Sequence, residues 1–448
     1  MTPALNREGV PPTLLPMDRR SFFVLLVAGC ADPNPNLLPP MAGGAPAPTP
    51  GSPDPITPPT RSGDAAFDAW AASFYARAVK AGLPPELLDR ELAGLTPDPR
   101  VADRDVKQPE FAKPFGDYIK GVVNDDRIAI GRRKRAELAP FLGPIEQTYG
   151  VPPEIVMGVW AMETGFGVIL GNFDVIRSMA SLAAQGRRRQ FAEDQLIAAL
   201  RIIGSGEFPR SRLIGSWAGA MGQTQFIPTT FLATAVDGDG DGKRDIWGSS
   251  ADALASAANL LAKGGWRRGE SWAREVSLPD GFDYGMTEGP RLIPDAWTAL
   301  GVKAADNGGF SPADAAAEAM LIAPTGSGGP AFLLFPNHFV IRKYNNATTY
   351  ALAVGLLADR FAGGGPLVRP WPPEIPLSLE DRIVSQKALK AVGFDPGSQD
   401  GVVGINTRAA LRSWQRARGL DADGYLSMDM VGRLKVEAAA LPPPAPVS

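Results

Sequence analysis

The stretch Val156–Gly167 reads Val-Met-Gly-Val-Trp-Ala-Met-Glu-Thr-Gly-Phe-Gly and is the most informative part of the sequence. Its apolar first half predicts a buried helix over Pro153–Met162, and two glycines end that helix just after Glu163. A carboxyl group beside Trp160 and Phe166 would be poorly solvated, which raises its pKa and suits it to proton donation near neutral pH. A helix-end glutamate that simply reaches water is the alternative, and this stretch alone does not decide between the two.

A second unusual stretch, Gly215–Thr229, reads Gly-Ser-Trp-Ala-Gly-Ala-Met-Gly-Gln-Thr-Gln-Phe-Ile-Pro-Thr. Its small residues let the backbone approach a ligand closely, and Ser216, Gln223 and Gln225 offer hydrogen bonds. Pro228 suits the first turn of a following helix. The pattern therefore predicts a ligand-binding segment, with a tightly packed crossover as the alternative.

The composition excludes several classes of function. The 448 residues include 45 Lys and Arg against 48 Asp and Glu, and the net charge of −3 argues against a nucleic-acid binder. With one histidine (His338) and one cysteine (Cys30), the chain cannot build an HExxH zinc site, a thiolate zinc cluster, a CxxC motif or an intrachain disulfide. A Ser-His-Asp site would need His338, and no GxSxG segment accompanies it. If the protein is an enzyme, we expect carboxylates to be its acids and bases.

Residues 1–30 have the layout of a bacterial export signal, with two arginines before a short apolar run, and Met17 is the expected start after an upstream extension. The run is too short for a membrane span, which needs about 20 apolar residues. Val27–Cys30 resembles the lipobox of bacterial lipoproteins, so Cys30 is the predicted lipidation site. An ordinary cleaved signal is the alternative, and the segment does not decide between the Sec and twin-arginine routes.

Composition shifts divide the rest of the chain into five parts. Residues 31–62 are rich in proline and form the expected extended tether. Residues 63–364 form the main folded domain, 365–376 a second Pro- and Gly-rich linker, and 377–437 a compact unit. Residues 438–448 are the expected tail.

The main domain is predicted to be mainly α. Apolar residues recur at helical spacing in several segments, separated by Pro- or Gly-rich breaks. The predicted helices cover 67–78, Glu86–Leu92, Arg127–Leu142, Pro153–Met162, Ala192–Ile203, Ala251–Ala262 and Thr349–Phe361. Strand-like alternation is scarce. Ala331–Phe335 and Phe339–Tyr344 are the best strand candidates, a small hairpin around Pro336 and Asn337.

An acidic series beginning at Asp237 reads Asp-Gly-Asp-Gly-Asp-Gly-Lys-Arg-Asp and predicts an EF-hand-like loop. Alternate carboxylates can converge on one hard cation, and the glycine at the sixth position permits the sharp turn. Gly248 stands where an EF-hand has its closing glutamate, so a later aspartate is expected to close the site. The predicted ligand positions are Asp237, Asp239, Asp241, Lys243, Asp245 and Asp252. We expect a structural Ca²⁺, or Na⁺ instead, that braces the loop; a solvated acidic turn is the alternative.

The pattern Glu-Thr-x-Phe-Gly at 163–167, followed by Gly-Ser-x-Ala-Gly-Ala-Met-Gly-x-x-Gln-Phe-x-Pro at 215–228, closely resembles the membrane-bound lytic murein transglycosylase B family. The similarity runs from about Phe67 to Phe361. It implies a lysozyme-like α domain with an extra helical subdomain. It also implies cleavage of the β-1,4 bond between N-acetylmuramic acid and N-acetylglucosamine in peptidoglycan.

The resemblance implies that Glu163 is the only catalytic acid and base, without a catalytic cofactor. The glutamate protonates the glycosidic oxygen and then deprotonates the muramoyl C6 hydroxyl, which attacks C1 and leaves a 1,6-anhydro end. Most glycosidases need two carboxylates, but an internal hydroxyl has an effective concentration that water cannot match. The alternatives are a hydrolytic muramidase and a non-catalytic wall-tethering lipoprotein.

The resemblance also implies a set of substrate contacts in the cleft beside the acid. One departure concerns Leu260, where the family often has tyrosine, so one contact to the sugar or to the acid is in doubt. His338 is expected to be structural. The implied substrate-binding residues are Ser216, Gln225, Tyr344, Asn345 and Tyr350.

The unit at 377–437 resembles the small three-helix peptidoglycan-binding domain, through its spaced Leu and Gln residues and its Asp-Gly turns at 400–401 and 423–424. Such a unit raises the concentration of the catalytic site on the cell wall. The expected partners are glycan strands and, through Cys30, a membrane, with no nucleic acid and a monomeric chain. Ala31 after the lipidated cysteine predicts a periplasmic protein anchored at the inner leaflet of the outer membrane.

Overall fold

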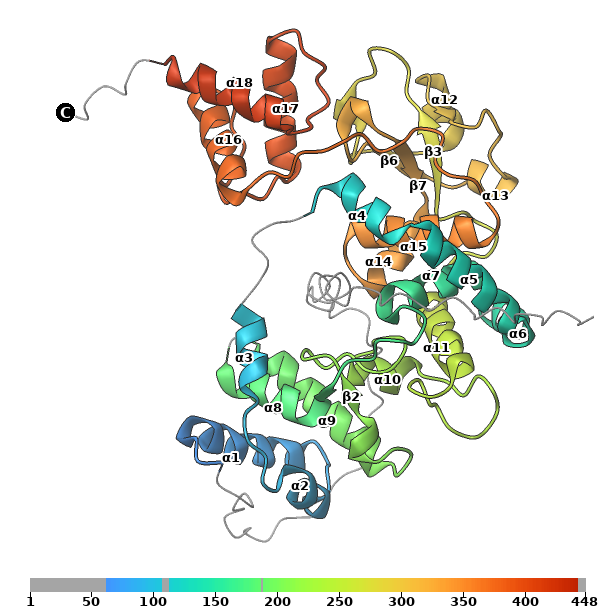
Figure 1. Cartoon of the computed structure of the whole chain (residues 1–448), viewed down its shortest axis with the longest axis vertical. Coiled ribbons are helices and arrows are strands. Elements are labelled where there is room, and N and C mark those ends of the chain that lie inside the picture. Colours follow the sequence, from blue (N-terminus) through green and yellow to red (C-terminus); the bar gives the residue numbers. More distant parts are fainter. Residues whose placement is uncertain (1–61, 107–112, 187, 442–448) are drawn as a thin grey trace, which may run out of the picture.

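The computed structural model describes residues 62–106, 113–186 and 188–441, which are mainly helical (Figure 1). Predictions for Cys30 and the signal, for all but the last residue of the tether, and for the end of the tail lie outside the described residues. Within those ranges, no helix has the length and apolar character that a membrane span needs.

Helix α7 (Pro153–Thr164) is the centre of the main domain and is buried along most of its length. It begins at a proline, whose fixed φ suits the first helical turn. Helix α15 packs closely against α7, because Gly158 leaves room for the backbone: a Cβ there would lie 2.6 Å from the carbonyl oxygen of Val354. Other helices complete this core, namely α4 (Phe115–Val122), α5 (Asp125–Glu137), α6 (Ala139–Tyr149), α11 (Ser250–Lys263), α14 (Pro336–Tyr344) and α15 (Thr348–Phe361).

A second apolar core holds the N-terminal helices together with the segment that follows α7. A two-stranded ribbon pairs β1 (Phe173–Asp174) with β2 (Ile214–Gly215) at its edge. In Figure 1, helices α1 and α2 lie at the bottom, on the far side of this core from the large sheet. The helices are α1 (Ala65–Lys80), α2 (Pro85–Leu92), α3 (Pro99–Val106), α8 (Val175–Gln185), α9 (Arg189–Gly204) and α10 (Pro228–Thr234).

A five-stranded antiparallel sheet forms a third core at the top of Figure 1. Of its strands only β7 (Ala331–Leu334) was predicted, as Ala331–Phe335. The registers Ala273↔Leu334 and Met320↔Leu334 place β7 between β3 and β6. Two short helices, α12 (Pro294–Ala299) and α13 (Pro312–Ala315), belong to the same region. In sheet order the strands are β4 (Arg291–Leu292), β6 (Ala319–Ile322), β7 (Ala331–Leu334), β3 (Ala273–Ser277) and β5 (Lys303–Ala304).

Two predicted elements are wrong. Phe339–Tyr344 is the second half of helix α14 rather than a strand, because Pro336 occupies the first helical position instead of a turn. Arg127–Leu142 is not one helix. Helix α5 ends before Leu138, since Pro140, which has no N–H for an intrahelical hydrogen bond, opens α6 instead.

The C-terminal unit is a bundle of three helices, α16 (Leu379–Ala391), α17 (Ile405–Ala417) and α18 (Met428–Ala439). Leu389, Leu411 and Trp414 lie in its core. The buried Gln386 accepts a hydrogen bond from the Gly401 N–H at 2.8 Å and donates to Thr407 at 3.1 Å, so its amide stabilises the turn before α17.

Candidate active site and acidic loop

Glu163 is the penultimate residue of α7 and is half-buried. The Tyr350 hydroxyl, near the start of α15, donates a hydrogen bond of 2.5 Å to its Oε1. Burial raises the pKa of Glu163 from 4.5 to about 7, although the hydrogen bond from Tyr350 acts in the opposite direction. At neutral pH the carboxyl group can therefore both release and accept a proton.

The chain turns sharply after Glu163. Gly165, Phe166 and Gly167 all have positive φ values, 58°, 64° and 80°. The Gly167 N–H donates to the Thr164 hydroxyl at 3.0 Å, and that hydroxyl donates to the carbonyl of Gln223 at 2.8 Å. The two segments singled out in the sequence thus hold each other in place.

Gln223, one of the predicted hydrogen-bonding groups, is occupied inside the protein. Its Oε1 accepts from Trp160 at 2.9 Å and from Ser250 at 3.1 Å, and its Nε2 donates to the carbonyl of Trp247 at 3.3 Å. Gly167 faces this amide, since a Cβ there would lie 2.6 Å from its Oε1. Gln223 therefore supports the turn from inside the core.

Tyr344 and Tyr350 lie side by side, with ring centroids 6.5 Å apart and nearly parallel planes. The Tyr344 hydroxyl donates to the Thr224 carbonyl at 2.6 Å. Burial, followed by the negative charge of Glu163, raises the pKa of both tyrosines well above 10, so both stay protonated hydrogen-bond donors. The structure thus brings three of the predicted site residues together.

Ser216 and Gln225 are both buried. The Ser216 hydroxyl accepts from the Ala220 N–H at 3.1 Å. Gln225 has a positive φ of 51° and donates from Nε2 to the carbonyl of Leu170 at 3.3 Å, on the loop after Glu163. Its Oε1 is buried and has no hydrogen-bond partner among the described residues.

Asn345 follows α14 directly and is half-buried. Its Oδ1 is likewise buried without a hydrogen-bond partner among the described residues. Leu260 is partly buried against the second core, where the Tyr344 ring also packs. The residue that departs from the family pattern is thus an apolar neighbour of the same cluster as Tyr344.

Tyr118 on α4, which the sequence analysis did not single out, packs against the core that contains Tyr350. Burial raises its pKa to about 12, and the charges of Glu163 and Arg127 act on it in opposite directions. Arg127 is itself half-buried, and burial lowers its pKa. A lone tyrosine in a short helix carries no sequence signal that marks it as a neighbour of Glu163.

His338 lies on α14, in a ring stack with Trp272 at 6.3 Å and edge-on to Phe339 at 5.3 Å. It is fully buried, and desolvation lowers its pKa to about 3. Neither ring nitrogen has a hydrogen-bond partner among the described residues. The only histidine of the chain is therefore a neutral core residue under ordinary conditions.

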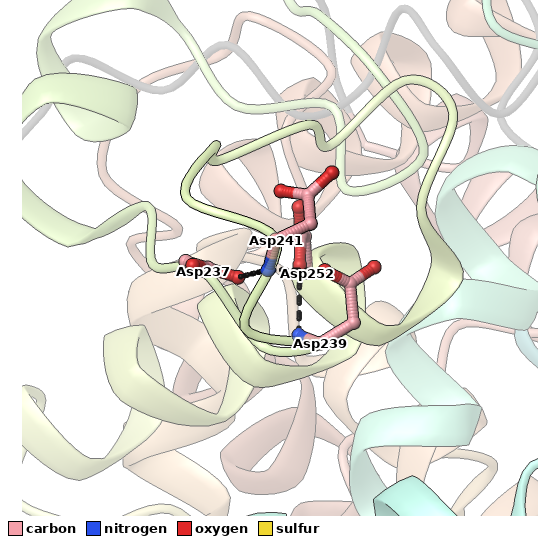
Figure 2. Close-up of side chains that lie close together, drawn as sticks. All are labelled: Asp237, Asp239, Asp241 and Asp252. Carbon is pink, nitrogen blue, oxygen red and sulfur yellow. Dashed lines mark hydrogen bonds between the residues drawn. The ribbon is translucent and has the colours of Figure 1, made fainter.

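Four carboxylates come together at the acidic loop: those of Asp237, Asp239 and Asp241, between α10 and α11, and that of Asp252, in the first turn of α11 (Figure 2). One oxygen from each lies within 4.8 Å of the others. Asp252 is fully buried, and its Oδ1 accepts from the N–H groups of Gly238 at 2.7 Å and Asp239 at 3.3 Å. Burial raises the pKa of Asp252, whereas hydrogen bonds led by the Gly242 N–H lower that of Asp237.

The group of carboxylates does not include Asp245, and Lys243 has no carboxylate; both residues stay predicted ligand positions. The Asp245 carboxylate accepts from Arg212 at 2.6 and 2.8 Å and from the Trp247 N–H at 3.0 Å. Lys243 donates its backbone N–H to Asp241 Oδ1 at 2.8 Å. The oxygen donors that remain are hard ligands of the type that Ca²⁺ prefers.

Comparison with known proteins places this arrangement among cell-wall enzymes. Residues 66–359 match the transglycosylase SLT domain, and residues 378–434 match a peptidoglycan-binding domain. The membrane-bound lytic murein transglycosylase B of Escherichia coli (strain K12) is 29% identical over 255 residues, which are 55% of this chain and 66% of that relative.

Solved structures show the same likeness. SltB3 from Pseudomonas aeruginosa, in complex with NAG-anhNAM-pentapeptide or with NAG-NAM-pentapeptide, is 46% identical with a TM-score of 0.78, over 83% of this chain and all of that one. The lytic transglycosylase Slt35 from Escherichia coli, in complex with calcium, is 28% identical with a TM-score of 0.55, over 65% of this chain and 92% of that one.

Proposed function

Because the chain belongs to the transglycosylase SLT domain family, we propose that it is a peptidoglycan lytic transglycosylase. It cleaves the β-1,4 bond between N-acetylmuramic acid and N-acetylglucosamine and leaves 1,6-anhydro ends. The observation that carries the proposal is a single glutamate, Glu163, whose pKa is raised to about 7. SltB3, the relative with 46% identity, binds both an anhydro and an ordinary muropeptide, which supports this substrate and product.

In the first step Glu163 acts as the acid. Its protonated carboxyl group donates to the glycosidic oxygen as the bond to C1 breaks. Tyr350 occupies Oε1, which leaves Oε2 as the oxygen that carries the proton. The Tyr350 hydroxyl then stabilises the carboxylate that forms, since it remains a donor throughout the step.

In the second step the Glu163 carboxylate accepts the proton of the muramoyl C6 hydroxyl, and that oxygen bonds to C1. The leaving sugar takes up the first proton and the glutamate recovers the second, so the enzyme ends as it began. The 1,6-anhydro ring forms without water because the attacking hydroxyl belongs to the same sugar. One carboxylate is enough for both steps.

We propose that Ser216, Gln225, Tyr344 and Asn345 hold the sugars beside Glu163. Buried acceptors without partners are costly unless a ligand satisfies them. Gln225 Oε1 and Asn345 Oδ1 are two such acceptors, and amide N–H and hydroxyl groups of N-acetyl sugars are suitable donors.

Digestion of purified sacculi tests the reaction. The protein should release muropeptides one water lighter than reducing-ended fragments, and Glu163→Gln should release none while still binding sacculi. Reducing-ended products from the parent protein would instead make it a hydrolytic muramidase. Binding without release by the parent would make it a wall tether.

We propose that the acidic loop binds one structural Ca²⁺, or Na⁺, through Asp237, Asp239, Asp241 and Asp252. The donor set fits such an ion, because four carboxylate oxygens gather within 4.8 Å of one another, and Slt35 has been solved in complex with calcium. The ion supplies positive charge that offsets the repulsion between these carboxylates. It has no part in bond cleavage.

The C-terminal unit is proposed to hold the wall near Glu163, with domain boundaries at 63–364, 365–376 and 377–437. Its separate apolar core and the match over residues 378–434 support this division. A pocket of about 420 Å³ on this unit, between the Phe394–Gly397 loop and Asn406 of α17, is a candidate contact for peptidoglycan.

We propose that the mature protein is a monomeric periplasmic lipoprotein attached through Cys30 to the inner leaflet of the outer membrane. The curated Escherichia coli relative is named as membrane-bound, which supports attachment. Labelling with a radioactive fatty acid tests it: the parent chain should incorporate the label and Cys30→Ala should not.

A further inference from the structure

We propose that Glu374, in the linker before the C-terminal unit, is a positioning residue that ties helix α4 to that unit and so fixes Tyr118 beside Glu163. The inference rests on the proposed function, because its kinetic readout is glycan cleavage. Glu374 is the only acidic residue between 365 and 376.

The Glu374 carboxylate joins two separate parts of the protein. Its Oε2 accepts from the Gly116 N–H, in the first turn of α4, at 2.6 Å. Its Oε1 accepts from the hydroxyl of Tyr425, in the C-terminal unit, at 2.6 Å. Both oxygens of one side chain are thus committed to partners that lie far apart in the sequence.

The contact at α4 leaves no spare room. A Cβ on Gly116 would lie 2.8 Å from Glu374 Oε2 and 2.9 Å from the Cβ of Trp371. The centroid of the Trp371 ring lies 5.5 Å from that of Phe115 and 6.1 Å from that of Phe332 in strand β7. The linker therefore packs between α4 and the sheet rather than hanging free.

The C-terminal unit also contacts the sheet region directly, and these contacts fix the position of Tyr425. Arg408 of α17 forms an ion pair with Glu288 at 2.8 Å. The Ser327 N–H donates to Asp423 at 3.0 Å. Glu288 adopts a positive φ of 60° at this contact, a conformation that non-glycine residues seldom take.

Helix α4 connects the Glu374 contact with the region around Glu163. Tyr118, two residues after Gly116, is half-buried and packs against the same core as Tyr350, on a helix that contacts α15. A charge-assisted hydrogen bond at the first turn of a helix of eight residues restrains the whole helix. Small misplacements of groups around a reacting centre cost large factors in rate, so the linker carboxylate influences catalysis through Tyr118.

The test compares Glu374→Ala with Glu374→Gln in the full protein, on soluble uncrosslinked glycan strands. Glu374→Ala should lower kcat/KM on the order of tenfold. Glu374→Gln should recover most of it, because its amide oxygen can still accept from the Gly116 N–H while its NH2 group donates to the Tyr425 hydroxyl oxygen. Arg416→Ala is the matched control. Its ion pair with Asp283 at 3.1 Å also joins the C-terminal unit to the sheet region, but both side chains are exposed and neither belongs to α4 or the linker.

Two further measurements test whether Glu374 acts through α4 and Tyr118. In a Tyr118→Phe background, Glu374→Ala should have little additional effect, since both changes act on one arrangement. Hydrogen exchange should quicken in α4 but not in α7. Full additivity with Tyr118→Phe, or unchanged exchange in α4, would overturn the inference. If the parent protein cleaves no glycan, the proposed function fails, and hydrogen exchange still decides whether Glu374 holds α4.

Discussion

The hydroxyl of Tyr350 lies 2.5 Å from Oε1 of Glu163, although 187 residues separate the two in the chain. Burial pushes the pKa of the glutamate up, and this hydrogen bond pulls it down, so that it settles at about 7. Tyr350 thus adjusts the acid to a pH at which it can serve as donor and acceptor in turn.

Tyr350→Phe should therefore raise the pKa of Glu163 further, because the hydrogen bond that favours the carboxylate is lost and the burial remains. We expect the basic limb of the activity profile to move to higher pH and kcat to fall by roughly tenfold or more. A pH series of initial rates measures both quantities. A basic limb that stays in place or moves to lower pH would contradict this role of Tyr350.

Glu163→Gln should become more stable than the parent as the pH rises. In the folded parent protein the Glu163 carboxyl group keeps its proton up to about pH 7, whereas in the unfolded chain it releases the proton near pH 4.5. The stability from this raised pKa is complete below pH 4.5 and is lost as the pH rises through 7. Since glutamine stays neutral, the variant should gain up to about 3 kcal/mol relative to the parent across this window.

Denaturant unfolding of both proteins across this pH window measures the difference in their unfolding free energies. Taking the difference between variant and parent removes the contributions of all other titrating groups. A difference that does not change with pH would show that Glu163 keeps its ordinary pKa.

Gly158→Ala should separate the two helices that carry Glu163 and Tyr350. The added methyl group would lie 2.6 Å from the Val354 carbonyl, so α15 must move. We expect a loss of about 1–3 kcal/mol in unfolding free energy, together with a fall in kcat. Gly143→Ala is the control, because Gly143 lies in helix α6 with no atom within 4 Å of the added Cβ, and alanine there should stabilise by about 1 kcal/mol.

Calcium should raise the melting temperature of the parent protein, and chelation should lower it, without changing the chemistry of cleavage. At a hundredfold excess over Kd, binding stabilises a folded protein by about 2.7 kcal/mol. Asp239→Asn should lose most of this response. Asp306→Asn, which changes an exposed aspartate outside the loop, should keep it. An Asp239→Asn variant that responds like the parent would place the ion elsewhere.

The sequence predicted the elements whose patterns are long and regular. The spacing of Phe67, Trp70 and Phe74 indicated α1, and all three are buried. The apolar run before Glu163 predicted α7, and Pro228 marked the start of α10. These segments have strong local signals, since one face or the whole helix must be buried.

What the sequence missed depends on contacts between distant residues. Four strands of the sheet have two to five residues each, too short to show an alternating pattern, and only the apolar run at β7 indicated a strand. Tyr118 comes close to Glu163 only when α4 packs against α15. Gln223 had the residue type of a ligand contact, and its engagement by Trp160 became visible only in three dimensions.

The distance along the chain between α7 and α15 also determines when the environment of Glu163 is complete. Synthesis completes Glu163 long before Tyr350, and until α15 docks the glutamate is exposed to water and ionised at neutral pH. A nascent or proteolytically shortened polypeptide that lacks α15 therefore has no proton to give. The environment that raises the pKa of Glu163 to about 7 thus requires contact between α7 and α15, which are distant in the sequence.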